Sequence, residues 1–300
     1  MKNPEGKWSF ALIVLAFVCG ASAWAQSLEG MVDIHIHCDP DSVPRAVDGF
    51  DVAMQARAAG MRAVVLKNHF EPTASMAYLV RKQVPGIEVF GGIALNRSVG
   101  GINPAAVERM ARVKGGWGRV VWMPTVDSEA QLASSHKSGP FVAATKDGKL
   151  LPEVLQVIAL SKRYNLTLET GHLSATEALL LLHEAHRAGV QHLVVTHAMI
   201  APTHMTIPQM REAASDGAYL EFVYNALIGG DKQFSIDDYV KAIREVGPEH
   251  CILASDLGQP HNPLPVPGLK LFVSALMAKG ITPAEISLML RTNPSHALGL

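Results

Sequence analysis

The sequence carries no excess of charge of either sign. Lys and Arg number 26 against 27 for Asp and Glu in 300 residues. Without a basic surplus or a recognisable motif, nothing indicates a nucleic-acid partner. Hydrophobic residues make up 48% and charged residues 18%, which is typical of a globular chain with a sizeable core. One domain can account for this length, because α/β barrels routinely reach it.

The sequence also lacks an apolar run long enough to cross a bilayer, which takes about 20 residues. The longest candidate, Trp8–Val18, follows the basic residues Lys2 and Lys7 and precedes a small-residue stretch ending at Ala25. This pattern predicts a signal peptide over residues 1–25, followed by one domain over 26–300. An uncleaved anchor is the alternative. Export predicts a periplasmic or secreted protein with no membrane span after cleavage.

Cysteine is scarce, and after removal of the signal peptide only Cys38 and Cys251 remain. An oxidising compartment would permit a disulfide between them. In the barrel described below, these residues lie at opposite ends of neighbouring strands, roughly five residues or ~16 Å apart along the strand. A disulfide needs Cα atoms closer than ~7 Å. We therefore expect two free thiols.

No Gly-rich dinucleotide fingerprint follows the first strand, which disfavours an open doubly wound sheet. Short apolar runs instead alternate with helical patterns along the whole chain, as strands buried on both faces require. Eight such βα units predict a (β/α)8 TIM barrel. The expected strands are 31–37, 62–67, 86–90, 118–124, 166–170, 192–196, 218–223 and 251–255. The expected helices are 51–59, 71–82, 104–113, 152–164, 174–188, 208–215, 237–245, 269–278 and 283–290, with an insertion or lid at 127–149.

Polar residues gather where these strands end, which in a TIM barrel is the face that carries the chemistry. His35 and His37 share one face of the first strand because strand side chains repeat every two residues. A pair of histidines alone is equally compatible with a metal site and with two ordinary histidines in a β-strand. Several other strand ends carry such groups as well, namely Lys67, His69, Glu169, His172, His197, Glu221 and Asp256.

The His35-x-His37 pair, Thr-Gly-His172, Val-Thr-His197 and Ala-Ser-Asp256 together resemble the amidohydrolase superfamily of metal-dependent hydrolases. The resemblance covers nearly the whole chain after residue 25. The closing segment 293–300 is also similar to the C-terminal segment common in that superfamily. The segments 66–69, 91–96, 122–125 and 255–259 resemble one branch that has no assigned reaction.

This resemblance implies that His35, His37 and Asp256 bind a first divalent metal and that His172 is a further ligand. His197 would bind a second ion or polarise the substrate. Imidazole and carboxylate ligands favour Zn²⁺, with Mn²⁺ or Fe²⁺ as alternatives and one or two ions. Such a metal lowers the pKa of bound water towards ~7. Asp256 would then act as the proton shuttle.

Three further residues leave alternatives open. The superfamily usually places a carboxylated lysine at the end of strand four, whereas this chain has Trp122 there and Lys67 at the end of strand two. Lys67 is interpreted as a carboxylated bridge, as a cation that binds a substrate anion, or as an ion-pair partner of Glu169 or Glu221, and we favour the second. His69 and Glu169 are further candidate ligands, and the alternatives are a loop hydrogen bond for His69 and an ion pair with Lys67 for Glu169.

The favoured function is a metal-dependent hydrolase that acts on a C–N or C–O bond of a small molecule, with Asp256, His197 and Lys67 in catalysis. The alternatives are a metal-dependent decarboxylase of a small carboxylic acid and a non-catalytic exported metal-binding protein. The sequence leaves open whether the protein forms a homo-oligomer.

Overall fold

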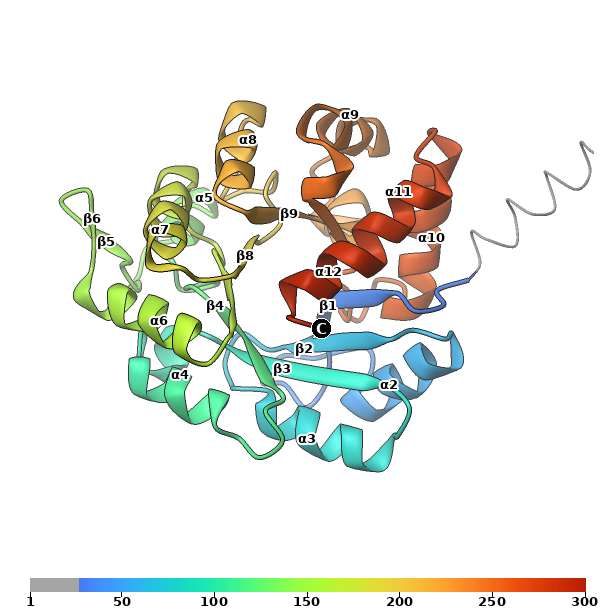
Figure 1. Cartoon of the computed structure of the whole chain (residues 1–300), viewed down its shortest axis with the longest axis horizontal. Coiled ribbons are helices and arrows are strands. Elements are labelled where there is room, and N and C mark those ends of the chain that lie inside the picture. Colours follow the sequence, from blue (N-terminus) through green and yellow to red (C-terminus); the bar gives the residue numbers. More distant parts are fainter. Residues whose placement is uncertain (1–26) are drawn as a thin grey trace, which may run out of the picture.

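The computed structural model describes residues 27–300, so the predicted signal peptide lies outside the described residues. Its main element is an eight-stranded parallel sheet in the order β1-β2-β3-β4-β7-β8-β9-β10, with every strand next to its sequence neighbour (Figure 1). The strands are β1 (Val32–His37), β2 (Ala63–Lys67), β3 (Glu88–Ala94), β4 (Gly118–Trp122), β7 (Thr167–Glu169), β8 (His192–Val195), β9 (Ala218–Val223) and β10 (Cys251–Ala254). The eight predicted strands are confirmed.

The sheet closes into a barrel between its first and last strands. Just beyond β10, the Asp256 N–H donates to His35 O at 2.8 Å and the His37 N–H donates to Leu257 O at 2.8 Å. An isolated parallel bridge pairs Ile36 with Leu257. These bonds satisfy edge groups that an open sheet would expose. The result is the predicted (β/α)8 architecture.

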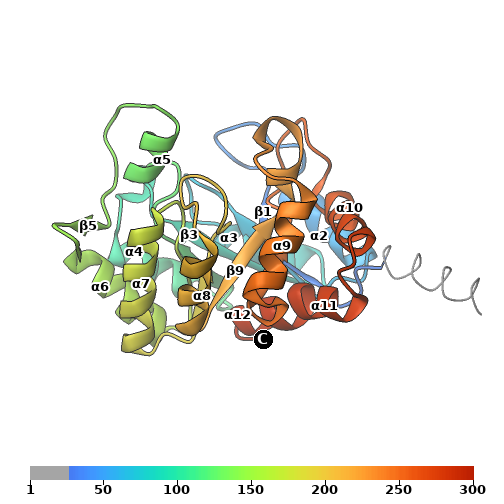
Figure 2. The ribbon, with the colours of Figure 1, turned by 90° about the horizontal axis from the view of Figure 1, so that it is seen from above.

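Helices surround the barrel, and most begin at residues that suit a helix start (Figure 2). Ser174 caps α7 with Glu177 in a capping box, and Asn103 caps α4 ahead of Pro104. The helices are α2 (Gly49–Ala58), α3 (Ala74–Gln83), α4 (Pro104–Ala111), α6 (Pro152–Arg163), α7 (Ala175–Ala188), α8 (Ile207–Ser215), α9 (Ile236–Val246), α10 (Pro265–Ala278), α11 (Pro283–Ser287) and α12 (Asn293–Ala297), with a π-helical turn at Leu288–Thr292. The predicted helices agree within a few residues.

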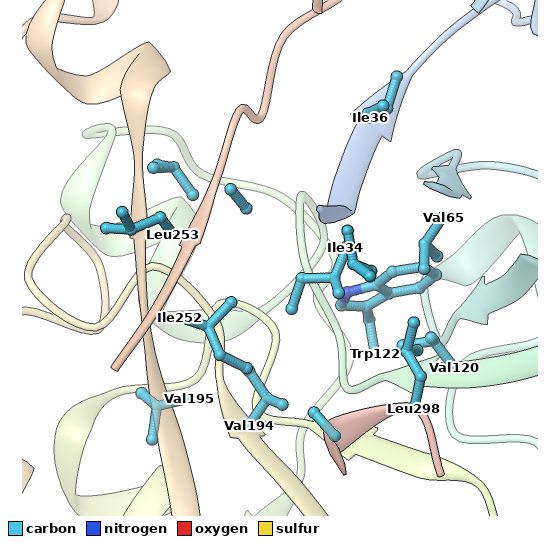
Figure 3. Packing of buried hydrophobic residues seen from close by; sticks show 14 of the residues in the cluster. Ile34, Ile36, Val65, Val120, Trp122, Val194, Val195, Ile252, Leu253 and Leu298 are labelled. Carbon is cyan, nitrogen blue, oxygen red and sulfur yellow. The ribbon is translucent and has the colours of Figure 1, made fainter. Parts of the chain in front are cut away.

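The core lies inside the barrel and between the barrel and its helices. Figure 3 shows part of it, with the Trp122 ring among aliphatic side chains of β1, β2 and β4. The chain's last helix covers the opposite end of the barrel from the cavity described below, since Ala297 O accepts from the Thr167 hydroxyl and Leu298 O from Arg119. Cys38 and Cys251 are buried free thiols, as expected.

The predicted insertion at 127–149 contains a short helix, α5 (Glu129–Ser134), and a hairpin of β5 (Thr145–Lys146) and β6 (Lys149–Leu150). It reaches the end of the barrel at which the strands terminate through Gln131 of α5, which lines a cavity there. Within residues 27–300, no helix combines the length and apolar character that crossing a membrane requires.

Candidate metal centre

A cavity of about 240 Å³ opens at the carboxyl ends of the strands. This is the face on which TIM barrels carry their sites. The predicted site residues His35, His37, Lys67, His69, His172, His197 and Asp256 all line it. Glu169 does not line the cavity, although it is fully buried beside it. Polar side chains from the loops complete the wall, namely Arg45, Gln131, Asn225, Asp231, Gln233 and Gln259.

Three of these side chains converge on one point. His35 Nε2 and His37 Nε2 each lie 3.1 Å from Asp256 Oδ1, and the three candidate ligand atoms lie within 4.8 Å of one another. The histidines come from β1, and Asp256 follows β10 with a positive φ of 51°. A non-glycine residue rarely adopts this conformation, and such strain is commonly found at functional sites. The bonds that close the barrel therefore also set the distance between these ligands.

Glu221 of β9 holds His35 from behind. His35 Nδ1 donates to Glu221 Oε1 at 3.1 Å, so the lone pair of Nε2 faces the cavity when the ring is neutral. Glu221 Oε2 also accepts the backbone N–H of His197 at 2.9 Å. One carboxylate therefore orients groups on two strands. The sequence interpretation gave Glu221 little weight, although its position between the buried residues Leu220 and Phe222 could have indicated an inward side chain.

His172 and His197 form a second pair. Their Nε2 atoms lie 3.1 Å apart, and His172 Nδ1 lies 2.8 Å from Gln131 Oε1 of α5. The amide oxygen can only accept, so His172 Nδ1 carries the proton and its Nε2 carries a lone pair. His197 Nδ1 is buried and has no partner among the described residues. This pair could hold a further ion.

His69 is fixed by a polar network from neighbouring strands. Its Nδ1 lies 2.8 Å from the Thr125 hydroxyl, which accepts from Asn96 Nδ2 at 2.6 Å. The same amide group donates to His69 O at 2.8 Å. The ring packs between His37 and His172, with ring centroids 4.9 Å and 5.9 Å away. His69 thus makes the loop hydrogen bond of one alternative while its ring stays beside the candidate ligands.

Lys67 is fully buried, and its Nζ lies 3.0 Å from His35 Nε2. Within residues 27–300, no carboxylate lies within 4.0 Å of that amine, so the alternative of an ion pair with Glu169 or Glu221 is not seen. Glu169 instead accepts from the Thr196 hydroxyl at 2.9 Å, and its other oxygen is buried without a partner. Burial and the nearby Glu221 raise the pKa of Glu169 to about 8.

The surroundings shift the pKa values of the histidines in opposite directions. Burial opposes a charged His35, but the carboxylates of Asp256 and Glu221 outweigh it and raise its pKa to about 10. Burial lowers the pKa of His37 and of His197 to about 4. Asp256 is also desolvated, yet His35 and His37 hold its pKa well below the usual range. His37, His197 and Asp256 are therefore in ligand-competent states at neutral pH.

The donor set fits a divalent metal. Zinc binds imidazole nitrogen at ~2.0–2.1 Å in tetrahedral sites, which places neighbouring ligand atoms about 3.3 Å apart. The separations of 3.1 Å from Asp256 Oδ1 to His35 Nε2 and to His37 Nε2 are close to that value. Asp33, which precedes them on β1, has a structural role, because its Oδ1 accepts the backbone N–H groups of His35 and Ser255 at 3.1 Å each. It joins β1 to the end of β10.

Several solved structures share this architecture. The chain is similar to an amidohydrolase from Pseudomonas aeruginosa, at 13% identity and a TM-score of 0.63 over 93% of this chain and 99% of the other. It is also similar to a phosphotriesterase homology protein from Escherichia coli, complexed with phosphate in its active site, at 18% identity and a TM-score of 0.62 over 90% and 98%. A 2,6-dihydroxybenzoate decarboxylase matches at 12% identity and a TM-score of 0.55, over 91% and 100%. The chain has the fold of these amidohydrolase and phosphotriesterase-like TIM barrels.

Within that fold class, the chain belongs to DUF6282, a family of unknown function whose model matches residues 30–221. Among curated proteins, none matches the chain in sequence. The matched region includes His35 and His37 of β1, His172 after β7 and His197 after β8, and it ends before Asp256.

Proposed function

We propose that this protein is a metal-dependent hydrolase that cleaves a C–N or C–O bond of a small molecule after export and removal of residues 1–25. The convergence of His35, His37 and Asp256, from the first and last strands of the barrel, carries the proposal. A histidine pair on one strand is common. A carboxylate brought to the same point from more than 200 residues away, with both nitrogens 3.1 Å from one oxygen, is not.

Each side chain of the site would have a distinct role in hydrolysis. His35, His37 and Asp256 would hold the first ion, His172 would add a ligand, and His197 would bind a second ion or polarise the scissile carbonyl group. A bound divalent metal would supply Lewis acidity and lower the pKa of water towards ~7. Asp256 is ionised and lies against both histidines, so it can accept the proton of the attacking water and deliver it to the leaving group.

Supporting residues fix this arrangement. Glu221 sets the tautomer of His35, and the raised pKa of Glu169 keeps that carboxyl mostly protonated near the site at neutral pH. Two interpretations of Lys67 remain, a substrate-binding cation and a carboxylated bridge between metals. Its position beside His35 Nε2 is compatible with both.

A decarboxylase is the second candidate. It is supported by the structural likeness to the dihydroxybenzoate decarboxylase and by Lys67 and Arg45, two cationic side chains in the cavity wall that suit a carboxylate substrate. An exported metal-binding protein without turnover is the third, since the ligand geometry alone does not require catalysis.

Metal analysis of the purified protein, followed by turnover assays with Zn²⁺ and Mn²⁺, tests the proposal. We expect at least one tightly bound divalent ion, and we expect metal-stimulated cleavage within a panel of N-acyl amino acids, esters and lactones. Release of CO₂ from 2,6-dihydroxybenzoate would favour the decarboxylase. Asp256→Asn should abolish turnover and leave the fold intact. Asp237→Asn, which changes an exposed aspartate paired with Lys279, is the matched control. Absence of both bound metal and metal stimulation would contradict the two enzyme functions.

A further inference from the structure

Arg45 places a buried guanidinium group in the wall of the cavity. It lies in the loop after β1 and lines the same space as His37 and Asp256. Its side chain is only 7% exposed, and the carboxylate of its partner Asp41 is fully buried. A buried ion pair is costly unless its remaining hydrogen-bonding groups find partners. The unused N–H groups of Arg45 are not among the sealed unpartnered atoms of the described residues, so they reach the cavity and are open to a ligand there.

Asp41 occupies only one edge of the guanidinium group. Arg45 Nε and Nη2 both lie 2.7 Å from the same oxygen, Asp41 Oδ2. The other oxygen, Oδ1, accepts the Val43 backbone N–H. Arg carries five N–H donors, and among the described residues Nη1 has no hydrogen-bond acceptor. Two parallel N–H groups of this kind match the two oxygens of a carboxylate or phosphate.

The loop that carries Arg45 is anchored on both sides. Asp39 N–H donates to Val47 O at 2.9 Å, and Gly49 N–H donates to Asp39 O at 3.1 Å. The Ala46 N–H donates to Gly258 O at 2.8 Å, next to the segment that carries Asp256. Arg45 is thus tied to the candidate metal centre through backbone bonds, which is the preorganisation that a recognition residue needs.

The charge of the cavity points the same way. Lys67 and Arg45 are both in the wall, and a divalent ion at His35, His37 and Asp256 would add further positive charge. Asp256 and Asp231 are the carboxylates in the wall. These carboxylates balance the two cationic side chains, so a divalent ion at the candidate metal centre would leave an excess of positive charge that an anionic ligand could neutralise.

We propose that Arg45 is a specificity-determining residue that binds an oxyanion, a carboxylate or phosphate group, at the end of the substrate distant from the reacting bond. The inference deepens the proposed function and rests on it, because a molecule bound at Arg45 is a substrate only if the protein is an enzyme. The cavity of 240 Å³ has the volume of about eight water molecules, so the substrate is a small polar anion.

Succinate and succinamate provide a direct test, because they have the same size and differ by one carboxylate. Binding is measured by titration calorimetry on the protein as purified and after loading with Zn²⁺. We expect succinate to bind at least about tenfold more tightly than succinamate, as a charge-assisted hydrogen bond predicts. In Arg45→Gln this ratio should fall to about one. 3-Phosphonopropionate, used in parallel, shows whether a carboxylate or a phosphate-type oxyanion is preferred.

Two further variants protect the test against misfolding and nonspecific charge effects. Arg45→Gln leaves the buried Asp41 without a partner, so Arg45→Gln with Asp41→Asn removes both charges together. Arg211→Gln is the control, because Arg211 is exposed and pairs with Glu245 far from the cavity wall. Thermal unfolding of each variant checks that it is folded.

The outcomes separate the two proposals. An equal affinity of the wild type for succinate and succinamate, or a ratio that survives both Arg45 variants, would overturn the role of Arg45. The measured metal content of the same samples judges the proposed function independently. Protein that neither binds metal nor shows metal stimulation, but whose affinity for succinate still depends on Arg45, would contradict the hydrolase and support the oxyanion site.

Discussion

His35 Nδ1 and Glu221 Oε1 lie 3.1 Å apart, and this bond decides which nitrogen of His35 faces the cavity. Residues that orient a metal-binding histidine typically change metal affinity 10- to 100-fold when they are replaced. We therefore predict that Glu221→Gln weakens Zn²⁺ binding by about that factor while the protein stays folded. Competition with a chromophoric chelator measures it. Glu212→Gln is the matched control, since Glu212 makes an exposed 3.0 Å contact with His183. Equal effects of both variants would exclude the orienting role.

Metal affinity should rise with pH. In the metal-free protein, His35 holds a proton up to a pKa of about 10, whereas an unfolded histidine titrates near 6.5. A metal that takes Nε2 must displace this proton. Between pH 6.5 and 8, the dissociation constant for Zn²⁺ should therefore fall by at least about tenfold per pH unit. Calorimetry in buffers of different ionisation enthalpy counts the released protons, and a pH-independent constant would contradict the prediction.

Replacement of Lys67 distinguishes its two remaining interpretations. If Lys67 binds a substrate anion, Lys67→Met keeps the metal content of the wild type and loses turnover. If Lys67 is a carboxylated bridge, the same variant loses metal. We expect the first result, in line with the interpretation favoured from the sequence. Carbon-13 NMR after incubation with labelled bicarbonate provides a second measurement, because a carbamate signal that Lys67→Met removes would establish the bridge.

Gly258 occupies a position that no other residue can take without strain. Its φ is 133°, and a Cβ atom there would lie only 1.9 Å from His37 O. Gly258→Ala should therefore destabilise the protein by about 3 kcal/mol or more and displace the segment that carries Asp256. Gly217→Ala is the control, because Gly217 has a φ of 83° but open space around it. Chemical denaturation compares the two, and a similar small loss in both would refute the steric argument.

The local pattern of the sequence was sufficient to predict the elements of the fold. The buried runs and the helix starts at Ser174 and Pro104 depend on neighbouring residues, and the structure places them within a few positions of the prediction. The proximity of the strand-end side chains could also be predicted, because the parallel strands of a barrel all end on one face. The inward direction of Glu169 was likewise readable from its alternation with the leucines of its strand.

Long-range partners could not be predicted in the same way. Whether Lys67 contacts Glu169 or His35 depends on the relative register of β1, β2 and β7, which no local pattern determines. The contact between Gln131 and His172 depends on how the insertion folds over the barrel. No local pattern distinguishes Arg45 from other loop residues, since only the packed loop reveals that it lines the cavity.

The hydrogen bonds that close the barrel between β1 and the end of β10 also determine at which stage of synthesis the site can form. His35 and His37 enter the chain more than 200 residues before Asp256 and the bonds that hold it. A nascent chain that stops before Asp256 has the two histidines without the carboxylate that completes the group. Capture of a metal by the proposed site would therefore require β10 and the segment after it, and a loaded ion would report that the first and last strands of the barrel have met.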